Sequence, residues 1–294
     1  MSSSPRVLCF GEVLWDLLPH GRFLGGAPLN VAYHLTQLGC SGGFVSAVGR
    51  DELGTEALAA VARSGVGTGL IARHPALRTG VAEVTLDAQG HAKFHLPQPV
   101  AWDDIDVTAA VTGEAPEAIV FGTLALRSRE NRTALTRLLD AFPAAWVVSD
   151  LNLRPPFDDL VPLQHWLGRA RLLKLNEDEA RRLCSRSATA TDWEVMAREL
   201  SGRHSGASVC ITLGGDGAGL LDAGRWHSMP SPAVTVRDTI GAGDSFTAAL
   251  ITGLLLTRGQ RDWNRILRNA CALGSYVAGH DGAQPSHAGF RAEW

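Results

Sequence analysis

The sequence of 294 residues lacks the Gly-Lys-Ser/Thr tripeptide of a Walker A loop, and no Gly-x-Gly-x-x-Gly pattern follows its first predicted strand. These absences count against a P-loop protein and against a nicotinamide-dependent dehydrogenase. The net charge of −3 gives no electrostatic footprint for nucleic acid. The longest apolar stretches, such as 248–256, are far shorter than a membrane span. We therefore expect neither a nucleic-acid partner nor a membrane.

Cysteine and histidine are dispersed along the sequence. The five cysteines are widely spaced, odd in number, and several lie in apolar runs, which predicts buried free thiols in a cytoplasmic protein. The ten histidines are scattered and form no mixed cluster with cysteine, so a zinc site is not expected. The first residues lead directly into a strand-like run, without a basic region and an apolar signal core.

What the sequence does contain is a regular alternation of short apolar runs and longer amphipathic stretches. The apolar runs suit strands that are buried on both faces: Val7–Phe10, Gly43–Val48, Ala118–Phe121, Trp146–Asp150, Leu172–Leu175 and Ser208–Leu213. The amphipathic stretches suit helices: 28–38, 52–64, 128–141, 192–202, 243–257 and 262–278. This order predicts an α/β fold, with a mostly parallel sheet and helices on both faces. Because no repeat or long linker interrupts it, we expect residues 1–294 to form a single domain.

Two segments break this alternation, about 12–24 and 78–98. Thr79–Leu86 and Ala92–Leu96 alternate apolar and polar residues, and the turn-forming stretch Asp87–Gly90 separates them. This pattern predicts a β-hairpin. The hairpin could belong to a small β structure apart from the main sheet. The alternative is an ordinary hairpin at the edge of the main sheet.

Residues 238–251 carry the strongest functional signal. Gly241, Ala242 and Gly243 form a turn that runs directly into an apolar segment of helical spacing. Free N–H groups at such a helix start, together with the helix dipole, favour an anion. Asp244 lies at the mouth of this anion site, where a carboxylate can accept the proton of a hydroxyl that attacks a bound phosphate. The alternative is that Asp244 only caps the helix.

A second glycine-rich segment occurs near the start of the chain, with Gly25-Gly26, Asn30, Gly39 and Gly49. Together with residues 238–251 it resembles the two signatures of the ribokinase-like sugar kinases, the phosphofructokinase-B-type family. The resemblance extends over essentially the whole chain, from Gly11-Glu12 to Gly282–Ser286. It implies a ribokinase-like fold in which segments 12–24 and 78–98 form a small β lid over a sugar.

The resemblance implies that Asp16, Gly26 and Asn30 contact the sugar, for which a carboxylate, an amide and a closely approaching backbone are suitable groups. The alternative for Asn30 is helix capping. Trp15 could stack on a sugar face or belong to the core.

Asp150, Asn152 and Arg154 follow a buried strand and alternate onto one side, at the end of the sheet where open α/β folds bind ligands. Fructokinases of the family carry a similar Asp-x-Asn-x-Arg-Pro. Arg154 could contact the sugar or neutralise phosphate charge. The alternative is a structural ion pair between Arg154 and Asp150.

Asn176 and Glu179 resemble the Asn-x-x-Glu motif of the family, which implies that they organise Mg²⁺ and its waters near the phosphates of ATP. Three acids in a first helical turn are also explained by the helix dipole alone. The resemblance further assigns Thr212, Gly214 and Gly217 to ATP. It also implies that Asp238, Ile240, Gly282 and Ser286 surround a monovalent cation such as K⁺, mainly through backbone carbonyls.

The sequence is thus interpreted as an ATP-dependent sugar kinase, with Asp244 as general base and fructose as the expected substrate. Gly11–Asp16, Gly25–Asn30, Pro99–Asp103 and Asp150–Arg154 are most similar to bacterial fructokinases. His95-Leu96-Pro97 replaces an aromatic-Arg pair that many fructokinases carry. This departure leaves 2-keto-3-deoxygluconate, ribose or a nucleoside open as substrates, and a non-catalytic sugar-binding regulator is the alternative of another class. The family also implies a homodimer formed through the lid.

Overall fold

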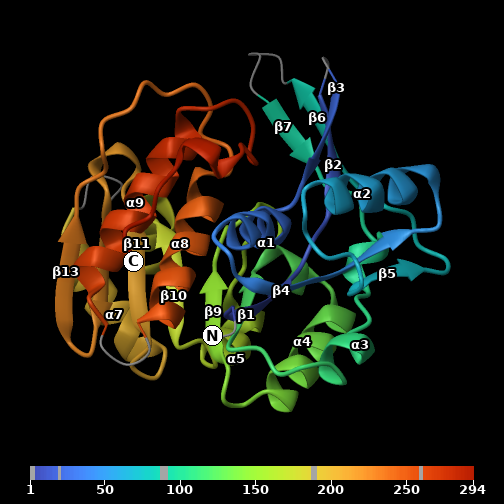
Figure 1. Ribbon diagram of the computed structural model, residues 1–294. Coiled ribbons are helices and arrows are strands. Elements are labelled where there is room, and N and C mark those ends of the chain that lie inside the picture. Colours follow the sequence, from blue (N-terminus) through green and yellow to red (C-terminus); the bar gives the residue numbers. More distant parts are fainter. Residues whose placement is uncertain (1–3, 19–20, 87–91, 187–190, 258–260) are drawn as a thin grey trace.

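The computed structural model describes residues 4–18, 21–86, 92–186, 191–257 and 261–294, and a nine-stranded sheet forms its centre (Figure 1). The strand order is β13-β12-β11-β10-β9-β8-β1-β4-β5. Its strands are β1 (Arg6–Phe10), β4 (Ser41–Gly49), β5 (Ile71–His74), β8 (Ala118–Gly122), β9 (Trp146–Asp150), β10 (Leu172–Asn176), β11 (Ser208–Thr212), β12 (Ala218–Asp222) and β13 (Arg225–Met229).

Seven of these strands, from β5 to β11, are parallel to their neighbours, whereas β12 and β13 add an antiparallel edge. The predicted mostly parallel α/β sheet is therefore confirmed, and the apolar runs form its buried strands. The antiparallel edge was not predicted. In β13 only scattered residues are partly buried, so its sequence lacks the apolar run that marks a central strand.

Helices cover both faces of the sheet, each over its own hydrophobic core. One face carries α1 (Ala27–Gln37), α2 (Glu52–Arg63), α8 (Ala242–Leu256) and α9 (Trp263–Ala278). The other carries α3 (Thr108–Val111), α4 (Arg129–Ala141), α5 (Gln164–Leu167), α6 (Glu177–Leu183) and α7 (Trp193–Arg203). Short 3₁₀ helices occupy Ala101–Asp103, Leu124–Arg127, Val161–Leu163, Gly214–Asp216 and His287–Gly289.

A separate four-stranded sheet projects beyond the main one, at the top of Figure 1. Its order is β3-β2-β6-β7, with β2 (Leu14–Leu18), β3 (Gly21–Gly25), β6 (Gly80–Leu86) and β7 (Ala92–His95). Because β6 pairs with β2 and β7 pairs with β6, the alternative of a hairpin on the edge of the main sheet is wrong. The predicted turn at Asp87–Gly90 lies outside the described residues.

Arg127 fastens this small sheet to the main body. Its guanidinium group makes a two-pronged ion pair with the buried Asp103 and also donates to the carbonyls of Leu96 and Pro97, which follow β7. The same group stacks 3.9 Å from the ring centre of Trp102. A planar guanidinium group serves such combined pairing and stacking well.

The structure also answers three smaller questions from the sequence. Trp15 is buried, and its indole N–H donates to the carbonyl of Leu53 on α2, so it packs in the core. All five cysteines are buried and free, as expected. Among the described residues, no helix is long and apolar enough to cross a membrane.

Candidate active site

The carboxyl ends of the parallel strands gather the polar residues that the sequence singled out. Lys174 of β10 pairs in register with Asp150 of β9, and Asn176 pairs with Thr212 of β11. The first turn of α8 lies against the same end of the sheet, because Gly243 is close to the ammonium group of Lys174. Open α/β sheets bind ligands at this edge.

The start of α8 forms the predicted anion site. Gly241, the N-cap residue, has φ of 79°, a left-handed conformation that glycine adopts freely. Ala242 N–H donates to the carbonyl of Thr239, whereas the N–H groups of Gly241, Gly243 and Asp244 find no acceptor within the described part of the chain. Three donors at a helix N-terminus are therefore free for an anion. We call these three groups and the adjoining turn the anion hole.

Asp244 lies in the first turn of α8 and is held from α1. Asn30 Nδ2 donates to Asp244 Oδ2 over 2.8 Å, and Gln284 Nε2 donates to Asn30 Oδ1 over 2.9 Å. Neither residue caps its helix, since the N-cap positions belong to Gly26 and Gly241. The capping alternatives for Asn30 and Asp244 are therefore wrong.

The surroundings of Asp244 favour its protonated form more than water does. Burial and the nearby Asp150 raise the pKa of the Asp244 carboxyl to about 6, against the hydrogen bond from Asn30 and the charges of Lys174 and Arg154. A carboxylate with a pKa just below neutrality is both ionised at pH 7 and a stronger base than an ordinary one. This is the property expected of a general base.

Glu12 lies directly after β1 and is buried. Oε1 accepts from the N–H of Ala27 over 3.3 Å, while Oε2 has no hydrogen-bond partner among the described residues. Burial raises the pKa of Glu12 to about 7, with a further contribution from Asp244. Gly26, with φ of 121°, passes so close to Glu12 that an added Cβ would lie 2.3 Å from its carbonyl oxygen. The sequence predicted a close backbone approach at Gly26, and in the structure the backbone of Gly26 packs on Glu12.

Asp16 and Arg154 approach this cluster from two sides. Asp16 lies on β2 of the small sheet and is half-buried, and burial raises its pKa while Arg154 opposes the rise. Arg154 is exposed, and within the described part of the chain its guanidinium group forms no hydrogen bond or ion pair. Its charge acts on Glu12, Asp16 and Asp244 together, so it can attract an anionic group to this place.

The proposed ion pair between Asp150 and Arg154 is wrong. Asp150 Oδ1 instead pairs with Lys174 Nζ at 3.1 Å, and both side chains are buried. Asn152, between the two predicted partners, has φ of 47°, so the chain leaves the extended conformation on which the one-sided arrangement depended. A charged lysine buried in a strand requires such a partner.

Asn176 and Glu179 form a capping box at the start of α6. Asn176 Oδ1 accepts from the N–H of Glu179, and Glu179 Oε2 accepts from the N–H of Asn176, each over 2.9 Å. Glu179 Oε1 accepts from the N–H of Leu153 over 2.7 Å. Each carboxylate oxygen keeps one further acceptor position. The pair can therefore order a metal-bound water in addition to capping the helix.

The three residues assigned to the nucleotide occupy β11 and the turn after it. Thr212 ends β11, and Gly214 has open space around its Cβ position. Gly217, with φ of 108°, packs against the backbone of Met229 and Pro230. This close packing is a sufficient structural reason for glycine at 217.

Of the residues assigned to a monovalent cation, the structure brings three together. The Asp238 carboxylate accepts from the N–H groups of Ile240 and Gly282 over 3.0 and 3.2 Å. The carbonyl of Ser286 instead accepts from the Tyr276 hydroxyl. No cluster of three or more histidine, cysteine or acidic residues suited to a metal ion occurs among the described residues.

The segment 283–287 completes the site from the far end of the chain. Its carbonyls accept from α1 side chains, with Tyr33 Oη donating to Pro285 and His34 Nε2 to Ala283. His287 Nε2 lies 2.8 Å from His34 Nδ1, and the two rings stack. These contacts hold Gln284 where it reaches Asn30.

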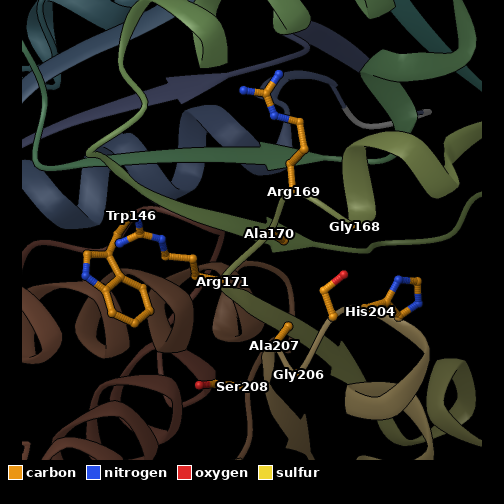
Figure 2. A pocket seen from close by; sticks show the side chains of 10 residues that line it. Trp146, Gly168, Arg169, Ala170, Arg171, His204, Gly206, Ala207 and Ser208 are labelled. Carbon is orange, nitrogen blue, oxygen red and sulfur yellow. The ribbon is translucent and has the colours of Figure 1, made fainter.

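A shallow pocket of about 340 Å³ lies at the opposite end of the strands (Figure 2). It is lined by Trp146 at the start of β9, by the loop before β10 and by the loop before β11. Figure 2 shows Arg171 extended toward Trp146 and Arg169 directed away. Arg169 pairs with Asp140 at 2.6 Å. The pocket is remote from the carboxyl ends of the strands, and we do not assign the reaction to it.

Comparison with known proteins identifies the class to which this fold and site belong. Residues 20–288 match the model of the pfkB family carbohydrate kinases, and the chain belongs to that family. Its fold class is ribokinase-like, with a mostly parallel sheet and a small second sheet.

Relatives within the family differ in the substrates that their names give. The chain is 29% identical to a fructokinase from Escherichia coli over 95% of both proteins. It is also 29% identical to an aminoimidazole riboside kinase from Salmonella typhimurium, over 96% of this chain and 92% of the relative. The crystal structure of a fructokinase double mutant from Vibrio cholerae, with fructose, ADP and potassium bound, has a TM-score of 0.81 at 23% identity. It covers 97% of this chain and 96% of that one.

Sequence reasoning assigned no role to Lys174, Glu12 or Gln284. A lysine inside the otherwise apolar strand 172–175 was a usable signal, because a buried charge requires a partner. The partner could not be inferred, since it depends on the register between β9 and β10. Gln284 was part of a recognised motif, but its contact with Asn30 spans 254 residues.

Proposed function

We propose that the protein transfers the γ-phosphoryl group of ATP to a hydroxymethyl group of fructose. The observation that carries this proposal is the arrangement at α8, where the Asp244 carboxylate stands beside three free N–H groups. The family establishes a carbohydrate kinase. ATP is supported by the ADP in the related fructokinase structure, and fructose by the name of the Escherichia coli relative.

In the proposed reaction the sugar hydroxyl oxygen forms a bond to the γ-phosphorus, and the bond from that phosphorus to the β,γ-bridging oxygen breaks. The hydroxyl proton passes to Asp244, and ADP leaves with the bridging oxygen. The anion hole of Gly241, Gly243 and Asp244 stabilises the charge on the transferring group. Phosphoryl transfer depends mainly on such positioning and electrostatics.

We assign the sugar to Asp16, Gly26, Asn30 and Arg154, of which Asn30 hydrogen-bonds Asp244. The nucleotide is assigned to Asn176, Thr212, Gly214 and Gly217. Mg²⁺ would neutralise phosphate charge, with Glu179 ordering its waters. Asp238, Ile240, Gly282 and Ser286 are proposed to surround K⁺, which the related fructokinase structure contains. We further propose one kinase domain over residues 1–294, cytoplasmic, with dimerisation through the small sheet, on whose edge strand β3 Phe23 is exposed.

Glu179→Gln should raise the Mg²⁺ concentration required for half-maximal activity and lower kcat, while sugar binding persists. The amide has lost the negative charge that orders metal-bound water. It also turns an NH₂ group toward one of the two backbone donors that the carboxylate now satisfies, at a cost of about 1–3 kcal/mol. A magnesium titration and a thermal melt measure the two effects separately.

Asp178→Asn is the matched control, because Asp178 lies in the same helical turn, is exposed, and pairs only at the surface with Arg181. Its magnesium titration should match that of the wild-type protein. If Glu179→Gln lowers the melting temperature but leaves the titration unchanged, Glu179 acts only as a helix cap.

Fructose should be phosphorylated with a higher kcat/KM than ribose, adenosine or 2-keto-3-deoxygluconate. Similar sugars differ by one or two hydroxyl contacts, and a hydrogen bond to a charged group contributes about 1.5–3 kcal/mol. A panel of sugars assayed by ADP release with ATP and Mg²⁺ provides the measurement, with the Asp244→Asn variant as the background.

The panel also separates the alternatives. A tenfold preference for another acceptor would replace fructose and leave the kinase mechanism in place. Adenosine turnover would indicate a nucleoside kinase. Sugar binding without turnover of any acceptor would indicate a non-catalytic regulator.

A further inference from the structure

The buried pair of Lys174 and Asp150 lies directly beneath the catalytic turn of α8. The two residues are in register on β10 and β9, 6% and 7% exposed, with Nζ and Oδ1 3.1 Å apart. The hydroxyl of Thr247, one turn into α8, donates to the other carboxylate oxygen of Asp150 over 2.7 Å. The pair therefore joins two central strands to the helix that carries Asp244.

Stability alone does not account for this pair. Removing two charges from water costs several kcal/mol per ion, and hydrophobic residues of similar volume often replace such pairs without loss. The residues next to Lys174 on its strand are Leu172, Leu173 and Leu175, so an apolar residue would suit the surrounding core. The pair is therefore better explained by its position.

That position places both charges next to Asp244. A Cβ atom on Gly243, the neighbour of Asp244, would lie only 3.2 Å from Lys174 Nζ. Asp150 and Lys174 act on the Asp244 carboxyl in opposite directions, the first raising and the second lowering its pKa. With both present, the charge of Lys174 opposes that of Asp150 at Asp244.

The other charged and polar groups around the pair and around Asp244 come from five elements or the loops that follow them. Glu12 and Arg154 face Asp244 from the ends of β1 and β9, and Asn30 hydrogen-bonds it from α1. Glu179 on α6 faces Lys174, as does the buried thiol of Cys210 on β11. Burial opposes the charge on Lys174, but Asp150, Glu179 and Asp244 together raise its pKa, so its ammonium group stays charged.

We propose that Lys174 and Asp150 are positioning residues for phosphoryl transfer: a buried pair of opposite charges that supports the first turn of α8 and balances the electrostatic potential at Asp244. The inference rests on the proposed function of Asp244 as general base. With the pair intact, Asp244 is ionised at neutral pH and can accept the hydroxyl proton. With one partner missing, the remaining charge acts on Asp244 without compensation.

The test measures kcat/KM as a function of pH, with ATP, Mg²⁺ and either fructose or the best acceptor of the sugar panel. The quantity compared is the pH at which kcat/KM falls on the acidic side, which we call the acidic limb. In Lys174→Met the uncompensated Asp150 should move this limb to higher pH by at least about half a unit, because neighbouring charges commonly shift a pKa by about 1–3 units. In Asp150→Asn the uncompensated Lys174 should move it to lower pH. The double variant should return it toward that of the wild-type protein.

Two controls keep the result specific. Arg169→Met removes a cation that pairs with Asp140 at the other end of the sheet, and its limb should coincide with that of the wild-type protein. Phosphate groups also titrate near pH 6, but ATP is common to all the variants, so only differences between variants are read.

Circular dichroism and thermal melts establish that each variant is folded. Lys174→Gln replaces Lys174→Met if the latter does not fold, and each single variant carries its own predicted direction.

Limbs that stay fixed in both single variants, or that move in the same direction, would overturn the inference while Asp244→Asn remains inactive. Activity retained in Asp244→Asn would instead overturn the proposed function, and the inference with it. Opposite shifts that cancel in the double variant would support the balanced pair, because a purely structural role lowers activity without moving the limb.

Discussion

Asp244→Asn should lower kcat by about 10² to 10⁴-fold while the protein stays folded, the range that a positioned general base contributes. The asparagine keeps an oxygen that can accept from Asn30 Nδ2, so the bridge between α1 and α8 persists. It cannot accept the proton of the attacking hydroxyl. ADP release under saturating sugar and ATP measures the loss, and calorimetry measures nucleotide binding, which should be nearly unchanged.

Asp140→Asn is the control, since Asp140 is exposed on α4 and pairs at the surface with Arg169. Its kcat should equal that of the wild-type protein. A folded Asp244→Asn protein with more than about a tenth of wild-type kcat would show that another group accepts the proton.

Gly241→Ala should both destabilise the protein and damage the anion hole. A side chain at φ of 79° is strained, and the new Cβ would meet the backbone of Ala283 at 2.6 Å from its oxygen and 2.7 Å from its Cα. The strain of a left-handed residue costs on the order of 1–3 kcal/mol, and the clash adds to it. Because relief requires the turn to move, we expect kcat to fall at least about tenfold, since small displacements of positioning groups are costly.

Gly224→Ala separates the two causes. Gly224 has φ of 77°, close to that of Gly241, but apart from its own atoms and those of its chain neighbours no atom of the described residues lies within 4 Å of its Cβ position. It should show only the backbone cost, a modest fall in melting temperature, with kcat unchanged. Equal melting temperatures and equal kcat in the two variants would contradict the close packing of Gly241 on Ala283.

Most of the fold could be predicted from the sequence because burial imposes patterns that one segment shows alone. Apolar runs such as Ala118–Phe121 form central strands, and the helical spacing after Gly243 marks α8. The edge strand β13 was not predicted, because its strand conformation depends on pairing with a neighbouring segment and not on its own composition. Its partner β12 shares its register and completes the hairpin.

The candidate site was predictable where a short segment carries its own chemistry. The turn at Gly241 predicted free N–H groups, and the structure contains them. The alternative that paired Asp150 with Arg154 is wrong, because strand register brings Lys174 to Asp150 instead. The spacing of residues within one segment therefore predicts its local chemistry. The contacts between segments depend on the register of the strands, which the sequence does not show.

The hydrogen bond from Gln284 to Asn30 has a consequence for the synthesis of the protein. Its two ends are 254 residues apart, so α1 leaves the ribosome long before its partner has been translated. At about 5–20 residues per second the interval is on the order of 10–50 s. Once β13 has been translated, the nascent chain contains every strand of the main sheet but still lacks the residue that orients Asn30. Synthesis of the segment that carries Gln284, and not only of the strands, is then required before a newly made molecule has this contact.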